Sequence, residues 1–156
     1  MTLTTGACWS CLGPVEPVDV AALSAWLRAA PPAWPNLPSL TKPQRVRCAG
    51  AVPNVLWLPL VEQALALLPH RPDGLVAHDV LLSRVRSGQS HPMHVDVQPD
   101  SWLARVHVPL VCAGGWFEWE DEPGRARFEV GQAYSFDTRA RHSFGNDGEK
   151  GRVHLV

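Results

Sequence analysis

The second half of the sequence, from Gly74 onward, consists of short apolar runs with a period of two, interrupted by Gly, Pro and Asp. Because alternate residues of a strand face opposite sides of a sheet, each run has the pattern of a half-buried strand. We expect strands near 75–86, 91–97, 102–110, 115–119, 125–130, 133–137, 141–145 and 152–156. Short strands joined only by turns, with no helical crossover, predict a mostly β fold, either a double-sheet jelly roll or a cupin-like barrel.

The first half of the sequence indicates helices and stiff connections instead. Asp19 is suited to cap a helix whose apolar residues recur at helical spacing, and the proline-rich stretch 31–43 ends that pattern. A second helix is expected to start near Pro59 and to end before Pro69. We therefore expect residues 1–74 to form a helical and proline-rich extension packed on a jelly-roll core.

The composition is that of one globular unit. The chain has 156 residues, of which 46% are hydrophobic and 19% charged, so it can bury a core as a single structural domain with the jelly roll at 75–156. The formal net charge is −1 and the basic residues form no long run, which argues against a nucleic-acid partner held through phosphates. The most apolar stretch, 51–68, is interrupted by prolines and polar residues, so no membrane span is expected. The sequence leaves the oligomeric state open.

Four cysteines raise the question of a second site. Cys8 and Cys11 have the spacing of half a zinc or redox site, but Cys48 and Cys112 stand alone and do not complete four ligands. The simpler interpretation is unpaired thiols, with Cys8 and Cys11 near a mobile terminus. With no recognisable signal segment at the start, a cytoplasmic enzyme with reduced thiols is the expectation.

The chemistry is expected at His94 and Asp96, together with a later His142. In an extended strand, residues i and i+2 face the same side, so His94 and Asp96 can offer an imidazole and a carboxylate to one ion. Two histidines and one carboxylate leave coordination positions open, as in non-haem Fe(II) oxygenases, whereas a structural zinc site is closed by four ligands. The sequence predicts a catalytic metal site on His94, Asp96 and His142.

Cationic side chains occur on strands that otherwise look buried. Arg105 and His107 share one face of their strand, and Arg152 lies on the terminal strand. A buried cation requires an anion or another partner, and the planar guanidinium can bind both oxygens of a carboxylate. The residues thus indicate an anion pocket beside the metal. Two alternatives stay open: an ion pair of Arg105 with an acid such as Glu118, and a hydrogen-bonded core role for His107.

Several segments together resemble a known family. Residues 82–88, 94–96, 105–110, 142–146 and 152–156 look like the aspartyl/asparaginyl β-hydroxylase-type branch of the Fe(II)/2-oxoglutarate-dependent oxygenases. The resemblance covers about half of the chain and lies in the combined spacing of these segments, not in any one of them. It implies a double-stranded β-helix fold and an oxidoreductase that uses Fe(II), 2-oxoglutarate and dioxygen.

The resemblance also implies roles for individual residues. His94 and His142 would bind iron, Asp96 would complete the triad, and Arg152 would bind the distal carboxylate of 2-oxoglutarate. The other expected co-substrate contacts are Ser83, Arg105 and His107. The activity expected is hydroxylation of an aliphatic C–H of an amino-acid side chain, in a small-molecule, peptide or carrier-bound substrate. The alternatives are a cupin-like metalloenzyme that does not use 2-oxoglutarate, and a non-catalytic carboxylate-binding jelly roll.

Overall fold

The computed structural model describes residues 8–39, 41–99, 102 and 104–156. Within them the chain forms two helices, α1 (Pro17–Ala29) and α2 (Asn54–Ala66). The strands are β1 (Trp9–Pro14), β2 (Gln44–Arg47), β3 (Leu81–Val85), β4 (Ser90–His94), β5 (Arg105–Val111), β6 (Gly115–Trp119), β7 (Gln132–Phe136), β8 (His142–Asn146) and β9 (Arg152–Leu155). No helix of the described residues is long and apolar enough to cross a membrane.

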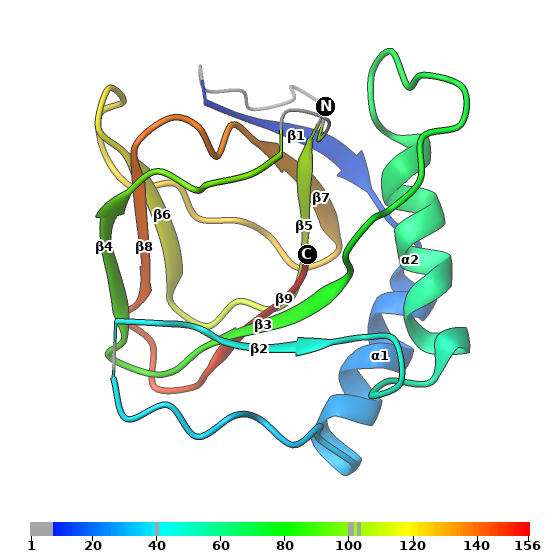
Figure 1. Ribbon diagram of the computed structural model, residues 1–156. Helices are drawn as coiled ribbons and strands as arrows, with labels where there is room; N and C mark the ends of the chain where they lie inside the picture. Colours follow the sequence, from blue (N-terminus) through cyan, green and yellow to red (C-terminus); the bar gives the residue numbers. More distant parts are fainter. Residues whose placement is uncertain (1–7, 40, 100–101, 103) are drawn as a thin grey trace.

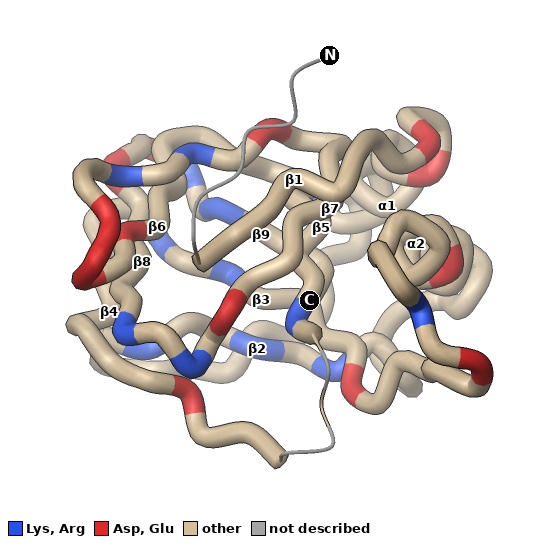
Figure 2. Tube along the Cα trace, turned by 90° about the horizontal axis from the view of Figure 1, so that it is seen from above, with Lys and Arg blue, Asp and Glu red and all other residues tan. Residues whose placement is uncertain are grey.

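The strands form two antiparallel sheets. The larger sheet has the order β1-β7-β5-β9-β3-β2, and the smaller has the order β4-β8-β6. The sheets face each other, and both helices cover the outer face of the larger one (Figure 1). The view from above shows the same three layers, with acidic and basic positions interspersed along the chain (Figure 2). This architecture confirms the predicted mostly β jelly roll.

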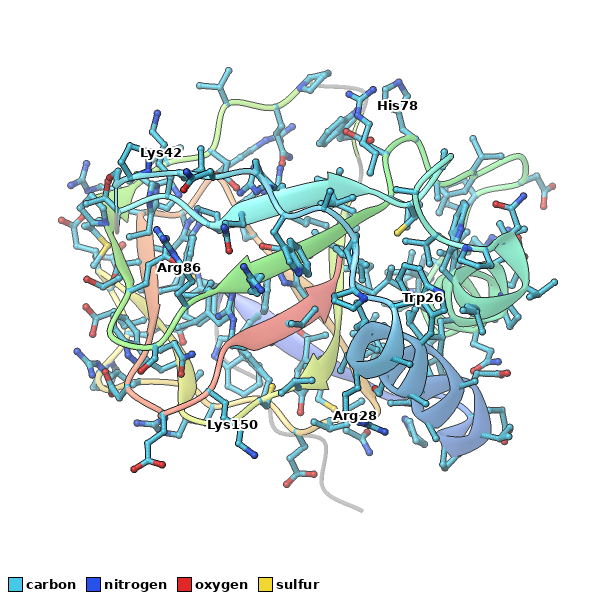
Figure 3. All side chains as sticks on the ribbon, turned by 90° about the horizontal axis from the view of Figure 1, so that it is seen from below. Trp26, Arg28, Lys42, His78, Arg86 and Lys150 are labelled. Carbon is cyan, nitrogen blue, oxygen red and sulfur yellow. The ribbon has the colours of Figure 1, made fainter. Side chains whose placement is uncertain are left out.

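The alternation of strand residues divides the core into two parts. On the outer face of the larger sheet, aliphatic side chains pack against the buried Leu23 of α1 and Leu60 of α2. Trp26, labelled in Figure 3, packs against this cluster from α1. Between the sheets the core is aromatic and contains Phe117, Trp119, Phe128, Tyr134, Phe136 and Phe144. The aliphatic half attaches the helices, and the aromatic half sets the spacing of the two sheets.

Both helices begin earlier than the sequence predicts. Glu16 stands at the N-cap of α1 and Pro17 at its first turn, without a side-chain cap bond. Proline is suited to this place because its missing N–H would have no partner there. Asp19, expected as the cap, instead accepts a hydrogen bond from Gln63 at 2.6 Å. Pro59 does not start α2 but lies inside it, where burial of neighbouring apolar residues outweighs the lost backbone bond.

The first half also contributes strands that the sequence analysis did not predict. β1 pairs with β7 and β2 pairs with β3, so residues before Gly74 supply both edges of the larger sheet. Conversely, the stretch expected as a strand at 125–130 forms only an isolated bridge, between Phe117 and Ala126. The strand expected at 102–110 begins at Arg105, and Leu103 lies outside the described residues. The Cys8–Cys11 segment is largely in β1 and is not a loose terminus.

Candidate metal centre

A β-bulge places two histidines opposite each other on neighbouring strands. β4 and β8 pair regularly at His91 and Phe144, but the register then shifts so that His94 stands opposite His142. The extra residue in β4 reverses which side chains face inward, as bulges do. The ring centroids of His94 and His142 lie 4.4 Å apart. The bulge therefore places both imidazoles on the inner face, next to each other.

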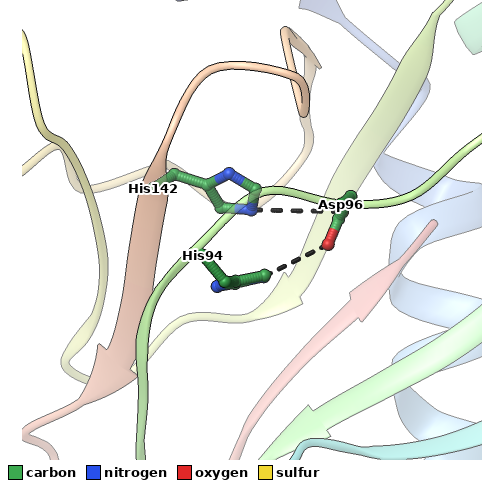
Figure 4. A group of neighbouring side chains, drawn as sticks. All are labelled: His94, Asp96 and His142. Carbon is green, nitrogen blue, oxygen red and sulfur yellow. Dashed lines mark hydrogen bonds and ion pairs between the residues drawn. The ribbon is translucent and has the colours of Figure 1, made fainter.

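Asp96 completes the group from the segment after β4. Its backbone N–H donates to Thr138 at 3.0 Å, which fixes this segment against the β7–β8 connection. The Nε2 of His94 lies 3.1 Å from Oδ1 of Asp96, and the Nε2 of His142 lies 4.0 Å from Oδ2 (Figure 4). One ligand atom from each residue lies within 4.8 Å of the others, and the described part of the chain has no other such group. The structure thus brings together the three predicted ligands.

The hydrogen bonds of the two imidazoles orient them for a cation. Nδ1 of His94 lies 2.8 Å from the carbonyl oxygen of Pro92, and Nδ1 of His142 lies 2.9 Å from that of Ala140. A carbonyl only accepts, so each Nδ1 carries a proton, and Nε2 is the ring nitrogen that each histidine turns toward Asp96. Burial, the main cause, lowers the pKa of His142, which favours its neutral form.

The donor set suits Fe(II). Two imidazole nitrogens and one carboxylate form the 2-His-1-carboxylate set of non-haem iron sites, with positions left for further ligands. A bare Nε2 facing a carboxylate oxygen at 3.1 Å brings two lone pairs together, which is unfavourable unless a proton or a cation lies between them. The residues present therefore fit a divalent metal.

Arg105 contacts this group directly. Its guanidinium donates a hydrogen bond to Oδ2 of Asp96. The alternative partner considered from the sequence, Glu118, is engaged by Arg125 at 3.3 Å and by Ser143 at 2.9 Å. Arg105 thus pairs with an acid, but with the candidate metal ligand itself, whose carboxylate it orients.

Arg152 is a buried cation with unsatisfied donors. The residue is 2% exposed, and its Nε and Nη1 have no hydrogen-bond partner among the residues that the structure describes. Its guanidinium lies over Phe117 at 4.6 Å and near Phe144 at 5.3 Å. Burial lowers the pKa of Arg152 to about 10, which leaves it charged at neutral pH. Buried donors of this kind require a partner, and an anion supplies one.

One cavity is lined both by two of the candidate metal ligands, Asp96 and His142, and by Arg152. It has a volume of about 500 Å³, within the range of ligand pockets. Of the residues predicted from the sequence it is lined by Ser83, Asp96, Arg105, His107, His142 and Arg152. The cavity continues along α2, where its lining is apolar and includes Val61, Ala64, Leu65 and Leu68. It therefore has a polar part at the metal group and an apolar arm.

Some residues of the site were missed by sequence reasoning. His154 and Cys112 form a buried hydrogen-bonded group with His107, and Arg45 of β2 lines the cavity. Desolvation and the neighbouring Arg105 lower the pKa of Arg45. The position of His154, two residues after Arg152 and so on the same strand face, was an available signal. Arg45 gave none, because β2 itself was not predicted.

Cys8 and Cys11 belong to no group of possible metal ligands among the residues that the structure describes. Cys8 and Cys11 are free thiols, as are the other two cysteines. The Sγ of Cys11 lies 3.9 Å from Oε1 of Gln132, and the backbone N–H of Cys8 donates to Glu122 at 2.6 Å. The contacts of both residues thus help to hold β1 against the rest of the fold.

Comparison with known proteins gives matches of structure only. No family model matches the sequence, and no curated protein matches it by sequence. The viral collagen prolyl hydroxylase vCPH from Paramecium bursaria chlorella virus-1, solved with 2-oxoglutarate, matches with a TM-score of 0.65 at 13% identity over 96% of each chain. A Pseudomonas putida prolyl-4-hydroxylase matches with a TM-score of 0.61 at 17% identity, over 95% of this chain and 89% of its own.

A third similar structure is that of an epimerase and not of a hydroxylase. It is the non-heme alpha-ketoglutarate-dependent epimerase SnoN from nogalamycin biosynthesis, with a TM-score of 0.68 at 14% identity, over 94% of this chain and 75% of its own. These likenesses establish the fold, the double-stranded β-helix that 2-oxoglutarate-dependent Fe(II) oxygenases share. At such identities they do not support the aspartyl/asparaginyl branch over others.

Proposed function

We propose that this chain is an Fe(II)- and 2-oxoglutarate-dependent oxygenase that hydroxylates an aliphatic C–H. One observation carries the proposal: Asp96 and His142 of the His–Asp–His group line the same cavity as the buried Arg152, whose Nε and Nη1 have no hydrogen-bond partner among the described residues. Neither feature alone is specific, since metals occur in many enzymes and buried arginines can be structural. A metal site beside a free cation is what a co-substrate with one chelating end and one distal carboxylate requires.

His94, Asp96 and His142 would hold the iron through two Nε2 atoms and one carboxylate oxygen. When bound, Fe(II) supplies the oxidising chemistry, in which dioxygen is reduced while 2-oxoglutarate is converted to succinate and CO₂. Arg105, through its bond to Asp96, would keep this carboxylate directed at the metal. The backbone carbonyls that accept from Nδ1 of each histidine keep the rings in the ligating tautomer.

Arg152 would bind the distal carboxylate of 2-oxoglutarate. Its unpaired Nε and Nη1 provide charge-assisted donors, and the buried hydroxyl of Ser83 lines the cavity as a further donor. Phe117 and Phe144, which pack beside the guanidinium, exclude water and so strengthen its attraction for an anion. The aromatic rings around Arg152 thus strengthen its attraction for an anion, while its Nε and Nη1 stay available to bind one.

The apolar arm of the cavity supports a substrate with an apolar part. We assign as substrate an amino-acid side chain, free, within a peptide or on a carrier, with its aliphatic portion lying toward α2. The similar structures include prolyl hydroxylases and an epimerase, and the resemblance to aspartyl/asparaginyl hydroxylases rests on the sequence segments. A reducing compartment such as the cytoplasm suits Fe(II) and the four free thiols.

A cupin-like metalloenzyme that does not use 2-oxoglutarate is the second candidate. The observation in its favour is that Arg105 already has an anionic partner in Asp96 and needs no co-substrate. Against it stands Arg152, because a buried guanidinium with two unpaired donors is unfavourable in a site that never receives an anion.

The test is conversion of 2-oxoglutarate to succinate by the full chain with Fe(II) and dioxygen, without added substrate. We expect slow turnover in the wild type and none in Asp96→Ala, with Asp73→Ala, on an exposed loop, as the matched control. Retained turnover in Asp96→Ala would reject the assigned metal site. Metal binding without any conversion would favour the second candidate, and carboxylate binding that survives chelation of the metal would indicate a non-catalytic binding protein.

A further inference from the structure

His154 is hydrogen-bonded to two other side chains, Cys112 and His107, and of the three only His107 was expected to contact the co-substrate. Its Nδ1 lies 3.2 Å from Nδ1 of His107, and its Nε2 lies 3.4 Å from Sγ of Cys112. His154 is fully buried and His107 is 8% exposed. The three residues therefore form one hydrogen-bonded line from Cys112 to His107, which lines the cavity.

Both histidines of this line are neutral. Burial, and after it the positive charge of Arg152, places the pKa of each well below its usual value. Two neutral imidazoles that meet through the same nitrogen must be different tautomers, because one Nδ1 must donate and the other must accept. The hydrogen bonds that join Cys112, His154 and His107 therefore all run in the same direction along the line, and two directions are possible.

In one direction the donors run toward the cavity. The thiol of Cys112 donates to Nε2 of His154, Nδ1–H of His154 donates to Nδ1 of His107, and His107 is left with its proton on Nε2. In the other direction the donors run away from the cavity, and His107 presents a bare Nε2. Since Nδ1 of His107 is taken by His154, Nε2 is the nitrogen left to meet a bound molecule.

Two features of the surroundings select the first direction. Burial raises the pKa of Cys112 to about 11, so this residue is a thiol with a proton to donate. The cavity beside His107 is lined by Arg152, whose two unpaired donors call for an anion. An anion prefers an N–H to a lone pair, and a chain of aligned donors strengthens its terminal bond.

We infer that Cys112 and His154 are positioning residues that fix the tautomer of His107, so that its Nε2–H donates to the carboxylate bound by Arg152. This inference rests on the proposed function for the identity of the carboxylate, 2-oxoglutarate. The direction of the line rests on the geometry alone and can be tested whether or not the chain turns over. No proton is transferred, and the line acts by setting which ring nitrogen carries the hydrogen.

The direct test is nuclear magnetic resonance of the full-length chain with ¹⁵N-labelled histidine, loaded with diamagnetic Zn²⁺ in place of iron. Long-range ¹H–¹⁵N correlations distinguish protonated from bare ring nitrogens, and His107→Asn and His154→Asn variants assign the two rings. We expect protonation at Nε2 of His107 and at Nδ1 of His154. A proton on Nδ1 of His107, or an imidazolium in either ring at neutral pH, would overturn the inference.

The second test measures the dissociation constant of 2-oxoglutarate with Zn²⁺ bound. Cys112→Ala and His154→Leu remove a donor and should weaken binding by about fivefold, the value of one hydrogen bond. Cys112→Ser keeps an O–H donor, and His154→Asn places an amide N–H near the former Nδ1, so both should restore binding. Cys48→Ala, which removes a thiol from the aliphatic cluster on the other face of the larger sheet, is the matched control.

The pattern of results separates the two claims. Equal weakening by Cys112→Ala and Cys112→Ser would contradict the inference, because only packing would then matter. If the wild type binds no 2-oxoglutarate, the proposed function fails, while the nuclear magnetic resonance result still decides the direction of the line.

Discussion

Gly115 of β6 lies where the aliphatic stem of Arg152 crosses between the two sheets. A Cβ built at Gly115 would overlap Cδ of Arg152 and contact its Cγ and Cβ. Glycine is the only residue that leaves this space free, so the small sheet makes room for a long side chain from the large one. The absence of a side chain at Gly115 thus sets the path by which the guanidinium reaches the cavity.

Gly115→Ala is therefore expected to displace Arg152 and to weaken 2-oxoglutarate binding by about tenfold or more, the effect of losing charge-assisted hydrogen bonds. Gly151→Ala is the matched control, because a Cβ there makes only ordinary contacts at 3.5 Å with Arg84. Titration of each metal-loaded variant with 2-oxoglutarate compares the two. Equal affinities would show that the stem of Arg152 can move without loss of function.

Arg152→Met should have opposite effects on stability and on binding. Within the described part of the chain, two nitrogens of the buried wild-type guanidinium have no hydrogen-bond partner. An apolar side chain of similar length should therefore raise the free energy of unfolding of the ligand-free protein. The gain expected is roughly 1–4 kcal/mol, the range for replacing buried charges by apolar groups. The same change should weaken 2-oxoglutarate binding about ten- to hundredfold. Urea unfolding with and without 2-oxoglutarate measures both, and a destabilised ligand-free variant would indicate a structural arginine.

The pH dependence of stability should report on the neutral histidines. The pKa of His107 and that of His154 are well below 6.5 in the folded protein, so below pH 6.5 the unfolded state binds more protons than the folded state. Stability is therefore complete above pH 6.5 and decreases as the pH falls, by up to about 1.4 kcal/mol per pH unit for each histidine. His154→Leu should reduce this slope between pH 6.5 and 5. An unchanged slope in His154→Leu would mean that His154 is charged when folded.

The apolar arm of the cavity should affect substrates and not the co-substrate. Ala64 of α2 is 6% exposed and lines the arm, whereas Ala66 on the same helix is exposed and outside it. Ala64→Trp should fill the arm and abolish stimulation of succinate formation by an apolar substrate, while Ala66→Trp should not. If Ala64→Trp unfolds the protein, the half-buried Leu68→Trp replaces it. Retained stimulation in a folded variant would place the substrate elsewhere.

Much of this site could be predicted because strand periodicity relates sequence to space directly. His94 and Asp96, or Arg105 and His107, are two residues apart, so an extended chain suffices to place each pair on one side. The buried strand β9 likewise marks Arg152 as a residue that requires a partner. The same rule applied to the next alternate residue would also have identified His154.

Other features depend on relationships that one segment of sequence does not contain. The bulge that sets His94 opposite His142 is a property of two paired strands, and β4 ends before Asp96. β1 and β2 are edge strands whose pairing partners lie far along the chain, and Gly13 and Pro14 obscure the alternation of β1. Arg45, which β2 carries to the cavity, could not be assigned for the same reason.

The most direct test of the metal and co-substrate site is an anaerobic titration of the full chain with Fe(II) and then 2-oxoglutarate, followed by visible absorption. Chelation of 2-oxoglutarate by iron on His94, Asp96 and His142 should produce a weak charge-transfer band in the wild type, at one equivalent of each. The band should be absent in Asp96→Ala and should require a much higher concentration of 2-oxoglutarate in Arg152→Met. A wild type that binds Fe(II) but shows no band, or a band that persists unchanged in Asp96→Ala, would contradict the account.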